Sequence, residues 1–151
     1  MKVLIIYDSV FGNTEQIAQA IGNALGSQKD IEVLRVSHVK PEQLTGLELL
    51  IVGSPTQGGR PTQAIQDFLN KVSEPAVKGT NVAAFDTRLS TRWVEIFGYA
   101  AERIAESLKR NGGMLIASPE GFFVKGRKGP LKKGELERAA SWAKAIVKNK
   151  K

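Results

Sequence analysis

The sequence predicts an α/β fold in which helices cover both faces of a doubly wound, five-stranded parallel sheet. Short apolar runs rich in Val, Ile and Leu alternate with amphipathic stretches along the chain, as expected for βα units joined by right-handed crossovers. The central runs are continuously apolar, which is typical of strands covered on both faces. No internal repeat or low-complexity linker interrupts the pattern, so we expect residues 1–151 to form a single domain.

The expected strands follow from the apolar runs. Residues 3–7 and 47–53 are bounded by turn-forming residues and predict core strands. Residues 31–36 alternate apolar and charged side chains, as a half-covered edge strand would. Two further core strands are expected at residues 81–85 and 114–118.

The expected helices follow from apolar residues at helical spacing. Residues 14–25, 61–72, 93–109 and 131–147 carry such spacing, and the second of these begins with Pro61 in its first turn. A short helix or turn is expected near residues 41–44. Residues 119–134 are rich in Gly and Lys and form the longest stretch expected to be irregular.

Composition excludes several classes of site. The chain has no cysteine, which excludes disulfides, thiolate metal sites and a cysteine nucleophile. His38 is the only histidine, which excludes a metal site built from several histidines. No apolar run approaches the ~20 residues of a membrane span, and we expect a cytoplasmic protein. Lys and Arg exceed Asp and Glu by 22 to 15, giving a net charge of +7.

The turn after the first strand carries the first candidate site. Residues 8–14 read Asp-Ser-Val-Phe-Gly-Asn-Thr and lead into a helix. A helix N-terminus offers free N–H groups and the positive end of the helix dipole, which suits a phosphate. The loop is neither a Walker loop nor a Gly-x-Gly-x-x-Gly fingerprint. The alternative interpretation is an ordinary helix cap made by Asn13 or Thr14.

Residues 7–18 resemble the FMN phosphate loop of the flavodoxin family, Thr/Ser-x-Thr-Gly-Asn-Thr. Phe11 departs from this pattern because it replaces a hydroxyl residue. The resemblance implies a three-layer sandwich with strand order 2-1-3-4-5 and FMN as cofactor. It assigns the phosphate to Ser9, Gly12, Asn13 and Thr14, together with the backbone N–H groups of Val10 and Phe11.

Two later loops resemble the flavin loops of the same family. Residues 53–62 resemble its second loop, and the third core strand ends where the family places its third. The resemblance implies that the flavin ring lies between these loops, and that a carbonyl of Gly58 or Gly59 meets the flavin N5. The alternative is a glycine-rich turn without a ligand. The implied ring contacts are Pro55, Thr56, Gln57, Gly58, Gly59, Asp86, Thr87 and Arg88.

The second loop has no aromatic residue, although many flavodoxins stack the ring between aromatic side chains of the second and third loops. Phe11, Trp93 and Phe97 could supply apolar cover, with helix or core packing as the alternative.

The resemblance implies an FMN protein that shuttles electrons between redox partners. The alternative is an FMN-dependent enzyme, either a quinone reductase or a relative of menaquinone-dependent protoporphyrinogen oxidase. A third possibility is an interaction module without FMN. Lys125, Arg127 and Lys128 would form a docking patch for an acidic redox partner or a solvated loop. Without a recognition motif, nucleic-acid binding is not expected.

Overall fold

The computed structural model describes residues 2–26, 30–72, 74–90 and 98–149. Its centre is a parallel sheet with strand order β2-β1-β3-β4-β5, and a sixth strand, β6, also pairs with β4. This arrangement confirms the predicted fold class and strand order. The strands are β1 (Lys2–Tyr7), β2 (Asp30–Arg35), β3 (Leu49–Pro55), β4 (Asn81–Leu89), β5 (Met114–Leu115) and β6 (Glu120–Val124).

The last strand position of the sheet is divided between β5 and β6. β5 pairs with the start of β4, and β6 pairs with its end, from Phe85 to Leu89. The prediction of one strand at residues 114–118 followed by an irregular stretch was therefore wrong. Pro119 has no N–H to donate to a ladder, which favours the interruption. The apolar run at residues 121–124 forms a strand despite its Gly- and Lys-rich surroundings.

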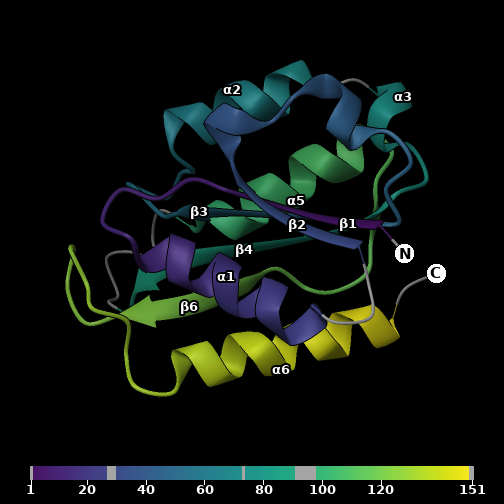
Figure 1. The fold of residues 1–151 in the computed structure, drawn as a ribbon. Coiled ribbons are helices and arrows are strands. Elements are labelled where there is room, and N and C mark those ends of the chain that lie inside the picture. Colours follow the sequence, from purple (N-terminus) through teal and green to yellow (C-terminus); the bar gives the residue numbers. More distant parts are fainter. Residues whose placement is uncertain (1, 27–29, 73, 91–97, 150–151) are drawn as a thin grey trace.

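The helices form two layers, one on each face of the sheet (Figure 1). α1 (Asn13–Leu25) and α6 (Glu135–Lys148) cover one face. α2 (Gln63–Lys71), α3 (Glu74–Val77) and α5 (Ala100–Arg110) lie over the other. Two 3₁₀ helices, η1 (Val36–His38) and η2 (Pro41–Leu44), precede β3, and the second confirms the short helix or turn expected there.

The helix starts differ from the expected ones. α2 begins after Thr62, whose side chain accepts a hydrogen bond from the Ile65 N–H, so Pro61 precedes the cap instead of lying in the first turn. α6 begins at Glu135, after the left-handed Gly134. α5 begins at Ala100, and residues 93–97 of the predicted helix lie outside the described residues.

Aromatic packing holds the middle of β4 and of β6 against α6. The rings of Phe85, Phe122 and Trp142 pack edge to face with centroids 6.1 to 6.2 Å apart. Gly53 on β3 makes room for this cluster, because a Cβ there would lie 2.1 Å from the Phe85 ring. Because the strands are parallel, their carboxyl ends lie at the same edge of the sheet (Figure 1). None of the described helices is long and apolar enough to span a bilayer.

Candidate functional site

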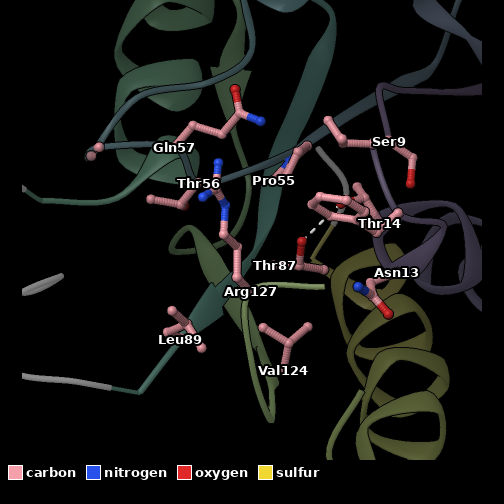
Figure 2. Close-up of a pocket in the computed structure, with 14 residues that line it drawn as sticks. Ser9, Asn13, Thr14, Pro55, Thr56, Gln57, Thr87, Leu89, Val124 and Arg127 are labelled. Carbon is pink, nitrogen blue, oxygen red and sulfur yellow. Dashed lines mark hydrogen bonds between the residues drawn. The ribbon is translucent and has the colours of Figure 1, made fainter. Parts of the chain in front are cut away.

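A cavity of about 530 Å³ opens at the carboxyl edge of the sheet (Figure 2). Its volume is within the range of about 300–1,000 Å³ usual for small-molecule and cofactor sites. Three loops that follow different strands surround it, together with the chain after β6. The described residues that line it are Ser9, Val10, Phe11, Asn13, Thr14, Pro55, Thr56, Gln57, Gly58, Gly59, Thr87, Leu89, Val124 and Arg127.

The first turn of α1 forms one wall of the cavity. Gly12 precedes the helix with φ of 91°, a left-handed conformation that favours glycine. The Ser9 hydroxyl accepts hydrogen bonds from the N–H groups of Gly12 at 3.1 Å and Glu15 at 3.4 Å. Within the described part of the chain, the N–H groups of Asn13 and Thr14 have no acceptor. They leave the positive end of α1 open to an anion.

Asp8 ties this loop to the start of α2. Its carboxylate accepts hydrogen bonds from the Ser9 N–H at 2.9 Å, from Arg35 at 3.2 Å and from the Thr62 hydroxyl at 2.5 Å. The first and second loops are therefore held at a fixed separation.

A tight turn stabilises the second loop. Gln57 and Arg60 exchange backbone hydrogen bonds of 2.8 and 3.1 Å. Between them, Gly58 and Gly59 have φ of 57° and 80°, a conformation that residues with a Cβ rarely adopt. The Thr56 N–H donates to the Thr87 carbonyl at 2.9 Å, which joins this loop to the end of β4.

Thr87 is the one residue of the predicted third loop that lines the cavity. Its hydroxyl lies 2.8 Å from that of Thr14, and the dashed line in Figure 2 marks this contact. Side chains alternate along a strand, so Asp86 and Arg88 project to the opposite face of β4.

Asp86 and Arg88 hold the start of α5. The Asp86 carboxylate, which is 0% exposed, accepts two hydrogen bonds from Arg88, at 2.7 and 2.8 Å, and one from the Ala101 N–H at 2.9 Å. Burial raises the pKa of Asp86, while these hydrogen bonds and the Arg88 charge oppose the rise. The Arg88 guanidinium stacks 3.4 Å from the centroid of the Tyr99 ring. Of the predicted site residues, Gly12, Asp86 and Arg88 do not line the cavity.

Sequence reasoning did not assign Leu89, Val124 or Arg127 to the cavity. Leu89 lies two residues beyond Thr87 on the same face of β4, and Val124 pairs with it from β6. The alternating pattern would have identified both if β4 had been extended and β6 recognised. Figure 2 shows the Arg127 side chain pointing into the cavity, toward the side where Thr56 and Gln57 lie.

Phe11 is the one aromatic residue among the described lining residues. It is 45% exposed, so it lies at the rim. Leu89, Val124 and Pro55 provide further apolar cover. Trp93 and Phe97 lie outside the described residues.

The basic segment after β6 contacts the first loop. The Asn13 side-chain amide donates to the Lys128 carbonyl at 3.2 Å. Gly129 packs so closely on the same amide that a Cβ would lie 2.5 Å from its oxygen. The Lys125 N–H donates to the Pro130 carbonyl at 2.9 Å. These contacts place Arg127 over the cavity, whereas Lys125 and Lys128 are exposed outside its lining.

Comparison with known proteins decides the family. A family model described as "Flavodoxin" matches residues 5–142, most of the chain. The chain belongs to the flavodoxin family. A flavodoxin from Maridesulfovibrio salexigens is 28% identical over 120 residues, covering 76% of this chain and 81% of that protein. One from Picosynechococcus sp. is 29% identical over 119 residues, covering 76% and 68%.

Solved structures agree with the family. The structure of a flavodoxin from the domain Archaea superposes with a TM-score of 0.83 at 25% identity, covering 98% of this chain and 97% of that one. Proteins of the flavodoxin family bind FMN.

The donors of this cavity fit FMN. A phosphate suits the open N–H groups of Asn13 and Thr14 and the Thr14 hydroxyl. A flat ring suits the apolar surface of Pro55, Leu89 and Val124.

Proposed function

We propose that this member of the flavodoxin family carries electrons between redox partners with FMN held in the cavity at the carboxyl edge of the sheet. The observation that carries the proposal is the meeting of three loops around one cavity, with the N-terminus of α1 open to an anion. Bound FMN supplies the redox chemistry, while the protein sets its orientation and its electrostatic surroundings. Residues 1–151 would act as one domain.

The first loop would hold the phosphate. The Ser9 hydroxyl stabilises the turn by accepting hydrogen bonds from two backbone N–H groups. The N–H groups of Asn13 and Thr14 would then donate to the phosphate. The buried Thr14 hydroxyl would add a donor. A phosphate at a helix N-terminus is also stabilised by the helix dipole.

The second loop and the ends of β4 and β6 would hold the ring. Pro55, Thr56 and Gln57 lie on one side of the cavity, and Leu89 and Val124 lie on the other (Figure 2). Gly58 and Gly59 would present their backbone to the ring edge, because neither residue has a side chain. Among the described residues, the contact with the ring would be mainly aliphatic, and it would exclude water from part of the ring.

The redox partner would be an acidic protein that docks beside the cavity. Lys125 and Lys128 are exposed next to the cavity mouth, and Arg127 lies between them in the chain. Complementary charge accelerates encounter between partner proteins more than it strengthens the complex. A cytoplasmic location stays a prediction that cell fractionation would test.

An anaerobic reductive titration with spectra at each step tests the proposal. We expect a yellow protein that takes up two electrons per bound FMN, and that neither oxidises NAD(P)H nor reduces a quinone rapidly by itself. A colourless protein that fails to bind added FMN would contradict the proposal. Rapid turnover of a quinone with NAD(P)H would instead identify an enzyme.

A further inference from the structure

A second cavity, of about 310 Å³, lies between α2 and α5. Arg60, Arg103 and Arg110 line it, and none of its described lining residues is acidic. Leu69 and Pro61 are its buried apolar members. The proposed electron transfer uses none of these arginines.

The charges of this cavity are uncompensated within the described part of the chain. No Asp or Glu oxygen there lies within 4 Å of a guanidinium nitrogen of Arg60, Arg103 or Arg110. Three like charges around one concave surface repel one another, and concave walls focus their field. An anion in the cavity would remove this repulsion.

The two helices present matching faces to the cavity. Arg103, Ser107 and Arg110 are spaced by four and three residues and share one face of α5. Gln66 and Asn70, four residues apart, lie opposite on α2. Arginine forks with neutral amide and hydroxyl donors between them are the groups that recognise phosphate oxygens in proteins.

Arg103 is already held in place. Its Nε donates to the Gly59 carbonyl at 2.8 Å, which leaves both terminal nitrogens for a ligand. This hydrogen bond also connects the two cavities, because Gly59 lines the first and its neighbour Arg60 lines the second. A ligand on Arg103 would therefore be sensed at Gly59.

We propose that the cavity between α2 and α5 binds a phosphate-type oxyanion, either a single phosphate or a diphosphate group. The three arginines would supply the charge, and Asn70 and Ser107 would supply neutral donors. The proposal goes beyond electron transfer and does not require that FMN occupy the first cavity.

Titration of the purified protein, followed by amide NMR at constant ionic strength, tests this site. Inorganic phosphate and pyrophosphate are added in turn, with chloride replaced so that total ionic strength is unchanged. We expect saturable shifts at Arg103, Ser107 and Gly59. Arg60→Gln and Arg110→Gln should each weaken binding by about tenfold or more, as for the loss of a hydrogen bond to a charged group.

Lys109→Gln is the matched control, because it removes one positive charge from α5 next to Arg110 but outside the cavity. It should bind like the unmodified protein. If neither anion saturates, or if Arg60→Gln and Arg110→Gln bind as well as Lys109→Gln, the site does not exist. Shifts at Asn13 and Thr14 would report a separate event, phosphate entering an FMN site that flavin has left open.

Discussion

The hydroxyls of Thr14 and Thr87 lie 2.8 Å apart and join the first turn of α1 to the end of β4. Both side chains are nearly buried, with 1% and 5% exposure. Each hydroxyl has one proton, so only one of the two donates to the other. If Thr14 donates to a phosphate, Thr87 must donate to Thr14. The pair would then orient the Thr14 proton toward the cavity.

Thr14→Val should weaken FMN binding by about 10- to 100-fold, the loss expected for a hydrogen bond of roughly 1.5–3 kcal/mol to a charged group. Quenching of flavin fluorescence on titration measures the affinity. Thr14→Ser keeps the hydroxyl and should bind nearly as well as the unmodified protein.

Thr87→Val tests whether FMN affinity depends on the Thr14 hydroxyl itself or on its hydrogen bond to Thr87. It removes the same 2.8 Å hydrogen bond but leaves the Thr14 proton available. We expect a smaller loss of affinity than for Thr14→Val. Equal affinity of Thr14→Val and the unmodified protein would exclude Thr14 from the phosphate site.

Gly58→Val should change the flavin potentials more than the fold. Gly58 has φ of 57°, and a Cβ there would meet no atom within 4 Å, so the substitution strains the backbone without a clash. The strain should lower the free energy of unfolding by about 1–2 kcal/mol. A branched residue also restricts reorientation of the peptide beside the flavin ring. The peptide would then stabilise the one-electron-reduced flavin less well, so the first and second one-electron reduction potentials of FMN should lie closer together.

Gly58→Asn is the control for this substitution, because Asn tolerates the left-handed region better than Val. Gly59→Val tests the neighbouring peptide in the same way. Reductive titration gives both potentials. If the difference between the two potentials is the same in Gly58→Val, Gly59→Val and the unmodified protein, neither peptide contacts the flavin.

The core strands were predictable because each lies in an apolar run, whereas the strand order and most of the first cavity were predictable from the resemblance of residues 7–18 and 53–62 to flavodoxin loops. The end of β4 was not, because Asp86 and Arg88 are charged and read as a loop. Their mutual hydrogen bonds allow both to lie within a strand. β6 was missed because Gly and Lys flank its short apolar run, and Val124 and the placement of Arg127 were missed with it.

Glu135 connects the first turn of α6 to β6, the strand that ends beside the cavity. Its carboxylate accepts hydrogen bonds from the Phe123 N–H at 2.6 Å and from Arg138 at 2.7 and 2.9 Å. Arg138 also donates to the Gly121 carbonyl and pairs with Glu120 at 3.2 Å. The hydrogen bonds from Arg138 lower the pKa of Glu135, with a further contribution from the Phe123 N–H.

Because the folded pKa of Glu135 is below its unfolded value, the ionised carboxylate stabilises the fold at every pH above the ordinary pKa of a glutamate. This contribution is lost as pH falls through the folded pKa. Glu135→Gln should therefore lower the free energy of unfolding at pH 7 by about 1–3 kcal/mol and have a smaller effect in strong acid. Urea unfolding across this pH range measures both.

Glu137→Gln is the matched control for Glu135→Gln, because Glu137 lies in the same first turn but is exposed. It should change neither the stability at pH 7 nor the loss toward acid. An unchanged pH profile for Glu135→Gln would mean that its ionisation does not support the fold.

Substitutions at Arg127 and Lys125 distinguish an effect on the flavin reduction potential from an effect on the docking of a partner. Arg127 lines the cavity, whereas Lys125 is exposed outside the lining. A reduced flavin carries a negative charge at N1, which a nearby guanidinium stabilises. Reversing one charge within ~10 Å of the ring changes this energy by about 1–2 kcal/mol per unit charge at an effective dielectric constant of ~20. Charges beyond a Debye length of ~10 Å at 0.1 M salt are largely screened.

Arg127→Glu should therefore make the second one-electron potential more negative by roughly 40–80 mV per unit of charge removed, using 59 mV for each tenfold change. The shift should be larger at low ionic strength. Lys125→Glu, which makes the same change of charge in the same segment, should leave the potential nearly unchanged and slow reduction by an acidic partner. Potentiometry at two salt concentrations measures the first effect, and stopped-flow mixing with the partner measures the second. Equal potentials for Arg127→Glu and the unmodified protein at low salt would show that Arg127 does not sense the flavin, and slower electron transfer by that variant would then assign it to docking.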